Sequence, residues 1–400
     1  EEPLCPVWAD GANAAFGTNS PFPLDTCAII TRMDKLLLGQ RIAQAREVLG
    51  MTQDGLGRAV GLDRSAISRL ENGERKLNVP ELVQIAAALG RPLAYFVADP
   101  VPAVVSRRSD TAHAHATTRQ LDVELDQFAS DIRELLAQNL LPAHERVTLA
   151  VPQNHEDAED TATKVRSQAS LDSQPITNLG KACEELGLYT YAAALGEGGA
   201  DGGCVEVVYS ASAVGAEVLN GDIPAGRRRM TLAHELGHWI FGDAYDSEAS
   251  ISSEQMINSF AIHFLAPRAG VVRVWNEQKS WATRDRALAV GAEFRLSWSA
   301  AVSQLRNLGL IDYDQHRALS DDEPRRGEYL RLGLAWTEEL AAPYLSPAFT
   351  AAVLTAYTDE RLTAARSLEL LRGTLSADHL PERTGGSIED LRRSFAGHDD

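Results

Sequence analysis

The stretch Thr231-Leu232-Ala233-His234-Glu235-Leu236-Gly237-His238-Trp239-Ile240 contains the pattern His-Glu-x-x-His within a run that favours a buried helix. Residues four apart lie on one helix face, so His234 and His238 can place two imidazole nitrogens about 2.0–2.1 Å from one Zn²⁺ ion. Glu235 projects beside them, where it can take a proton from an attacking water. The stretch therefore predicts a zinc-dependent hydrolytic site with Glu235 as its catalytic base.

A catalytic zinc ion takes a third protein ligand and keeps one position open. The acids that follow this stretch are Asp243, Asp246, Glu248 and Glu254. We choose Glu254 as the third ligand because it begins an amphipathic stretch that continues to Pro267. Asn258 lies one turn along the same face and is expected to bond the far nitrogen of a ligating histidine. Asp243 and Glu248 are expected to be loop or cap acids.

Short β-prone runs precede the zinc motif, and helical patterns follow it. The runs cover residues 188–195, 204–209 and 216–219 and are separated by glycine-rich turns. They predict an antiparallel meander. Residues 284–311 have the pattern of a helix, a short turn and a capped helix, which is the outline of a helix-turn-helix. We therefore expect a central α+β, zincin-like domain with a short antiparallel sheet and a helical carboxyl-terminal region.

The amino-terminal part has the pattern of short helices joined by tight turns. A first helix is expected from Leu37 to Leu49, and Thr52 and Asp63 are expected to cap the next two. This segment is slightly basic, whereas the whole chain has a net charge of −18. A local basic patch can bind a phosphate backbone that an acidic surface would repel. The pattern indicates a DNA-binding helix-turn-helix.

The segments Gly50-Met51-Thr52-Gln53 and Ile67-Ser68-Arg69-Leu70-Glu71-Asn72-Gly73 resemble the Cro/C1-type (XRE) DNA-binding domain. The resemblance implies that the third helix enters the major groove of a double-stranded operator, usually as a homodimer. It makes Arg64, Ser65, Ser68 and Arg69 the expected base or phosphate contacts, and Gln53 the expected phosphate anchor. Glu71 is expected to hold the turn through an internal pair.

The run from Asn220 through His238, together with Glu254-x-x-x-Asn258 and Leu265-Ala266-Pro267, resembles the ImmA/IrrE family of zinc metallopeptidases. The resemblance implies a Zn²⁺ cofactor and cleavage of XRE-type repressor proteins. Because the XRE-like segment is fused to this one, the substrate could be a separate repressor, the chain itself, or nothing. The alternative function is a ligand-responsive DNA-binding regulator whose zinc domain senses or scaffolds without proteolysis.

The organisation that follows is mainly α, with an amino-terminal five-helix DNA-binding domain. We expect a disordered extension at 1–36, the helix-turn-helix domain at 37–98, and a linker with an acidic amphipathic helix at 99–155. The peptidase domain is expected at 156–270 and the helical region, with its second helix-turn-helix-like segment, at 271–400.

Composition limits the remaining classes. The 400 residues are 44% hydrophobic and 24% charged, which describes a globular chain. The four cysteines form no C-x-x-C pair, which favours a reducing compartment. No run approaches the ~18 apolar residues that span a bilayer, and no secretory signal pattern is present. We expect a cytoplasmic protein without a membrane partner.

Overall fold

The computed structural model describes residues 35–91, 93–97, 114–142, 148–210, 212–242, 251–335 and 338–383. Most of the expected extension at 1–36, and most of the expected linker that begins at residue 99, lie outside these ranges. None of the helices in these ranges has both the length and the apolar composition of a bilayer-spanning segment.

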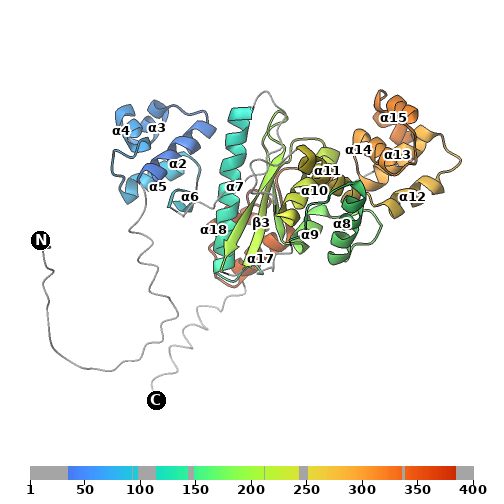
Figure 1. Ribbon diagram of the computed structural model, residues 1–400. Coiled ribbons are helices and arrows are strands. Elements are labelled where there is room, and N and C mark those ends of the chain that lie inside the picture. The colour runs from blue at the N-terminus through green and yellow to red at the C-terminus, as the bar shows by residue number, and fades with distance from the viewer. Residues whose placement is uncertain are drawn as a thin grey trace, which may run out of the picture.

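The first described segment forms the five helices that the sequence predicts (Figure 1). They are α2 (Lys35–Val48), α3 (Gln53–Val60), α4 (Arg64–Glu71), α5 (Val79–Ala88) and α6 (Leu93–Val97). Thr52 and Asp63 cap α3 and α4 as expected, accepting bonds from the backbone nitrogens of Gly55 and Ala66 at 3.0 and 2.6 Å. A small core fixes the bundle, with fully buried side chains at Ile42, Leu56, Ile67 and Ile85. Local capping and helical periodicity therefore account for this part of the fold.

A four-stranded sheet lies at the centre of the described chain. Its strands are β1 (Leu188–Ala193), β2 (Gly202–Tyr209), β3 (Ser212–Asn220) and the short β4 (Tyr344–Leu345), in the order β2-β3-β1-β4. The β2–β3 pair is antiparallel, as is β1–β4, but β1 and β3 pair in parallel. The expected antiparallel meander is therefore wrong, and the sheet is mixed. The glycine-rich turn after β1 marks the end of a strand correctly but does not fix its partner, because β3 lies between β1 and β2.

Each face of the sheet has its own helical cover (Figure 1). On one face lie α7 (Ala114–Ala137), α17 (Pro347–Thr358) and α18 (Ala364–Leu370). On the other lie α8 (His155–Gln168), α9 (Leu179–Glu185), α10 (Ala225–Phe241) and α11 (Ile251–Leu265). Successive strand residues point to opposite faces of the sheet. Val218 therefore packs with the helices of the first face, and Leu219 packs with those of the second. The zinc motif, on α10, is thus packed against the sheet.

The acidic amphipathic helix of the sequence analysis is α7, and its apolar face is buried on the sheet. Leu125 and Phe128 are fully buried there, while Val123 is buried in the core of the amino-terminal bundle. Its acids bond arginines from distant segments. Glu124 accepts from both Arg91 and Arg372, each at 3.2 Å. Helix α7 therefore contacts the helix-turn-helix bundle, the sheet and the turn around Arg372 that follows α18.

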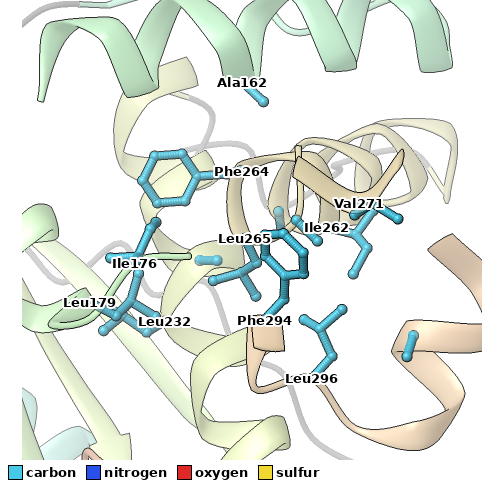
Figure 2. Packing of buried hydrophobic residues seen from close by; sticks show 14 of the residues in the cluster. Ala162, Ile176, Leu179, Leu232, Ile262, Phe264, Leu265, Val271, Phe294 and Leu296 are labelled. Atoms are coloured by element: carbon cyan, nitrogen blue, oxygen red, sulfur yellow. The ribbon is translucent and has the colours of Figure 1, made fainter. Parts of the chain in front are cut away.

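The remaining helices extend the core beneath α10 and α11. They are α12 (Arg268–Glu277), α13 (Thr283–Phe294), α14 (Trp298–Asn307), α15 (Tyr313–Ser320) and α16 (Arg326–Arg331). A short 3₁₀ turn (Ala377–His379) lies apart from this core, after α18. Ser297 caps α14 by accepting from the backbone nitrogen of Ala300, so the expected helix, turn and capped helix are present. Figure 2 shows Leu265 of α11 beside Phe294, with Leu296 close by, while Phe264 lies toward Ala162 and Ile176. A single hydrophobic cluster thus continues past residue 270, where a domain boundary was expected, to Leu340.

Candidate metal centre and DNA-binding surface

The zinc motif lies in the buried middle of α10. Leu232 and Leu236 are fully buried in the core, which orients the helix, and Gly242 ends it in the left-handed conformation at φ 69°. His234 and His238 are one turn apart and are each only 2% exposed. Their Nε2 atoms are 3.0 Å apart. Two buried imidazoles with facing nitrogens need a shared partner, and a cation is the partner that suits both lone pairs.

Helix α11 brings Glu254 to these imidazoles. Its carboxylate oxygens lie 3.3 Å from His234 Nε2 and 3.5 Å from His238 Nε2. Ligands at about 2.0–2.1 Å in tetrahedral geometry would be about 3.3 Å apart. The three edges of 3.0, 3.3 and 3.5 Å match that spacing, so the donor set fits a zinc ion. Among the described residues, these three form the group of histidines, cysteines and acids close enough to share a metal.

Asn258 lies behind His234, at the position that the sequence predicts. Its Oδ1 is 3.1 Å from His234 Nδ1, and its Nδ2 donates to the backbone oxygen of Glu254 at 2.9 Å. An Nδ1–H that donates to Asn258 leaves the Nε2 lone pair of His234 directed at the site. The other acids considered as ligands, Asp243, Asp246 and Glu248, lie outside the described residues.

The centre is enclosed on the side of the sheet and opens on the side of Glu254. Glu235 is fully buried, whereas the Glu254 side chain is 43% exposed. The buried carboxyl of Glu217, in β3, has a pKa well above its usual value because of burial and the nearby Glu235 carboxylate. Thr190 donates to it at 3.0 Å. The sequence analysis missed Glu217, although an acid within the β-prone run 216–219 is a signal of a special buried group.

A cleft of about 760 Å³ lies next to the metal centre. Met230 of α10 and Asn258 of α11 line it, as do Ser299 and Ser303 of α14. Arg227, which also lines the cleft, is paired with the buried Asp201 at 2.8 Å. The carboxyl-terminal helices thus supply one wall of the hollow nearest to the candidate site.

The expected DNA-contacting residues lie on the exposed side of α4. Arg64, Ser65 and Arg69 are exposed and Ser68 is partly buried. Their backbone therefore presents them away from the bundle core, as DNA contact requires. Their roles stay predictions.

Gln53 and Glu71 join α3 and α4 beneath that surface. Arg46 binds the Glu71 carboxylate through two nitrogens, at 2.6 and 3.0 Å, so Glu71 has the internal pair that the sequence analysis expects. Gln53 Nε2 donates to the same carboxylate at 2.8 Å. The side chain of Gln53 thus braces the turn, and its expected phosphate contact stays a prediction.

These features define a helix-turn-helix protein that also carries a His-Glu-x-x-His helix against a mixed sheet. Residues 42–96 match the family model described as helix-turn-helix, and residues 218–306 match that of the IrrE N-terminal-like domain. Both resemblances indicated by the motifs are thereby confirmed. The second match extends beyond residue 270 through α14, as does the hydrophobic core.

A curated relative shares the amino-terminal part. It is described as an uncharacterized transcriptional regulator in the ATPase CF(0) region of Rhodospirillum rubrum, and it is 36% identical over 62 residues. The match covers 16% of this chain and 57% of that protein.

Two solved structures are similar over longer stretches but at low scores. PlcR of Bacillus thuringiensis, in complex with the peptide PapR7 and DNA, is 11% identical with a TM-score of 0.17, covering 84% of this chain and 92% of that one. ComR from Streptococcus suis is 13% identical with a TM-score of 0.17, covering 93% and 100%. At these scores neither match bears on the fold.

Proposed function

We propose that this protein is a cytoplasmic DNA-binding transcriptional regulator whose IrrE-like domain is a zinc-dependent endopeptidase. The observation that carries the proposal is the triad of His234, His238 and Glu254, whose mutual distances suit tetrahedral zinc. The two histidines are on α10, which also bears Glu235, and Glu254 is on α11. A DNA-binding domain alone does not need three metal donors around one buried point.

The proposed reaction is hydrolysis of a peptide bond in a repressor-type protein. His234, His238 and Glu254 would hold the ion, and Asn258 would fix the ring of His234. A zinc ion held there would supply a Lewis acid for the scissile carbonyl and lower the pKa of a water. Glu235 accepts a proton as the water oxygen bonds the carbonyl carbon. It then gives that proton to the leaving nitrogen as the C–N bond breaks.

The DNA-binding part of the proposal rests on the helix-turn-helix match and on the exposed face of α4. Arg64, Ser65, Ser68 and Arg69 would read or position an operator, and Gln53 would lie near a phosphate. A single helix-turn-helix covers few base pairs, so we propose that two copies bind a two-fold symmetric operator.

Glu235→Gln separates the proposed peptidase from a zinc domain that only senses or scaffolds. The zinc-loaded wild type and the variant are incubated with candidate XRE-type repressors, and the products are measured by mass spectrometry. Zinc content and binding to DNA selected from a random pool are measured in parallel. We expect the variant to keep zinc and DNA affinity but to lose cleavage, because glutamine has the same shape and no basic carboxylate.

Two further variants complete the comparison. His238→Ala should lose zinc and cleavage together, while Glu185→Gln, on the exposed side of α9, should change neither. If no repressor is cut by the wild type, and Glu235→Gln behaves like it in every assay, the peptidase proposal is wrong and the scaffold function replaces it.

A further inference from the structure

The cleft beside the metal centre continues into two other hollows. The middle one has a volume of about 480 Å³ and shares His155 and Asn307 with the cleft. The far one, of about 510 Å³, shares Glu159 and Arg268 with the middle one. Because each hollow shares lining residues with the next, the three lie in a row that leads away from the metal centre, and we call this row the groove.

Helix α8 forms one wall along the length of the groove. His155, Glu159, Thr163 and Ser167 line it at intervals of four residues, so they form a stripe on one face of the helix. At about 1.5 Å per residue this stripe is about 18 Å long. An extended chain rises about 3.3 Å per residue, so the stripe matches five or six residues of an extended peptide.

His263 lines the middle hollow, and Gln304 fixes the tautomer of its ring. Gln304 Nε2 donates to the backbone oxygen of Ala266 at 2.8 Å and lies 3.2 Å from His263 Nδ1. Since the carbonyl oxygen of Ala266 can only accept, the Gln304 atom that faces both Ala266 and His263 must be the amide nitrogen. His263 Nδ1 is then an acceptor, and the ring proton is on Nε2.

The environment of His263 keeps this donor available. The ring is 3% exposed and lines the middle hollow. Burial, opposed by Glu159, lowers the pKa of His263 to about 4, so the ring stays neutral at pH 7. Its Nδ1 is held by Gln304, so the Nε2–H remains for a group that enters the hollow. A backbone carbonyl of a bound peptide would satisfy this donor.

The middle hollow also has an uncompensated negative charge. Arg268 binds Glu159 through two nitrogens at 2.6 and 2.8 Å, which neutralises that acid. Glu156 and Asp160 line the same hollow, are exposed, and lie one turn apart on α8. Two carboxylates at this spacing suit a cationic side chain placed between them and disfavour an anionic one.

We propose that this groove binds an extended segment of the polypeptide substrate, with a backbone carbonyl on His263 and a lysine or arginine side chain at Glu156 and Asp160. The inference rests on the proposed peptidase function and adds to it the kind of substrate segment that is recognised. The groove places the cationic residue away from the scissile bond, because the middle hollow touches the cleft and not the metal triad.

Selection from a phage-displayed random heptapeptide library tests the groove without a known substrate. The target is the full-length chain with Glu235→Gln, which should bind a peptide without cutting it. We expect the selected peptides to be enriched in lysine and arginine. Binding of one selected peptide is then measured by fluorescence anisotropy, with the chain metal-free and zinc-loaded.

Two variants in the same background assign the binding to the groove. Glu156→Gln with Asp160→Asn changes only exposed side chains and should weaken binding roughly two- to tenfold. His263→Phe removes one buried donor and should weaken it by a similar factor. Asp314→Asn with Asp359→Asn removes two exposed acids that line none of the three hollows and should leave binding unchanged.

The outcomes separate this inference from the proposed function. Selected peptides without basic residues, or with equal affinity for the wild-type groove and both groove variants, would overturn the groove assignment even if the protein is a peptidase. If basic peptides bind through Glu156, Asp160 and His263 but the wild-type chain cuts no substrate, the groove assignment holds. In that case the peptidase proposal is wrong.

Discussion

Removal of the Asn258 side chain tests how much of the metal centre depends on its support. Asn258 touches both elements of the site, since Oδ1 is 3.1 Å from His234 Nδ1 and Nδ2 donates to the backbone of Glu254. Asn258→Leu keeps the approximate volume but removes both polar contacts. His234 can then rotate, and its Nδ1–H loses its acceptor. Asn258→Asp keeps an acceptor for His234.

The expected magnitude follows from the loss of one bond to a ligating ring. Partners of this kind typically change metal affinity by about 10- to 100-fold. That range corresponds to about 1.4–2.8 kcal/mol of binding free energy. We therefore expect Asn258→Leu to bind zinc about 10- to 100-fold more weakly than the wild type, and Asn258→Asp to bind within about threefold of it.

Competition with a chromophoric zinc chelator measures these affinities on the metal-free full-length chain. Asn307→Ala is the matched control, because Asn307 lines the same cleft but is an exposed residue of α14. It should leave zinc affinity unchanged. If Asn258→Leu binds zinc as tightly as this control does, His234 needs no support from Asn258, and the described tautomer of His234 is wrong.

Three other perturbations have definite expected outcomes. Burial raises the pKa of Asp126 to about 6, above about 3.9 in an unfolded chain, so the folded state holds the proton more tightly and the free energy of unfolding falls as pH rises from about 4 to about 6. Asp126→Asn should abolish that fall in urea titrations and stabilise the chain at pH 7 by about 2 kcal/mol; an unchanged pH profile would contradict it. Glu71→Gln leaves the buried Arg46 with only the partly exposed Glu47, 3.6 Å away, as a countercharge and should cost about 3 kcal/mol in the same titrations, whereas a loss under about 1 kcal/mol would show that the Arg46–Glu71 pair is dispensable. Arg69→Ala should reduce the slope of log affinity against log salt by about one on selected double-stranded DNA, and an unaltered slope would remove Arg69 from the DNA contacts.

The features that the sequence predicts well are set by neighbours within a few residues. The caps at Thr52 and Asp63 and the five short helices depend on local patterns. The approach of His234 to His238 follows directly from helical spacing. Glu254 and Asn258 needed one further assumption, that α11 packs along α10. Because Glu254 and Asn258 are four residues apart, they lie on the same face of α11, and both reach the site when α11 packs along α10.

The features that the sequence does not predict depend on pairing between distant segments. The turn after β1 has the same composition whether β1 pairs with β2 or with β3, so the parallel β1–β3 pair is not visible in it. The raised pKa of Glu217 depends on the packing of β3 against α10, which buries this carboxyl group near Glu235. The bond from Gln53 to Glu71 likewise depends on the packing of α3 against α4. In each case tertiary packing, not local propensity, sets the role of the residue.

The position of α7 has a mechanical consequence. Glu124 accepts hydrogen bonds from Arg91, in the turn between α5 and α6 of the helix-turn-helix bundle, and from Arg372, after α18. Arg372 in turn holds Asp131 on the same helix at 2.7 Å. Because both arginines bind the middle of α7, a shift of the turn around Arg372 either moves the helix-turn-helix bundle with it or breaks one of these hydrogen bonds.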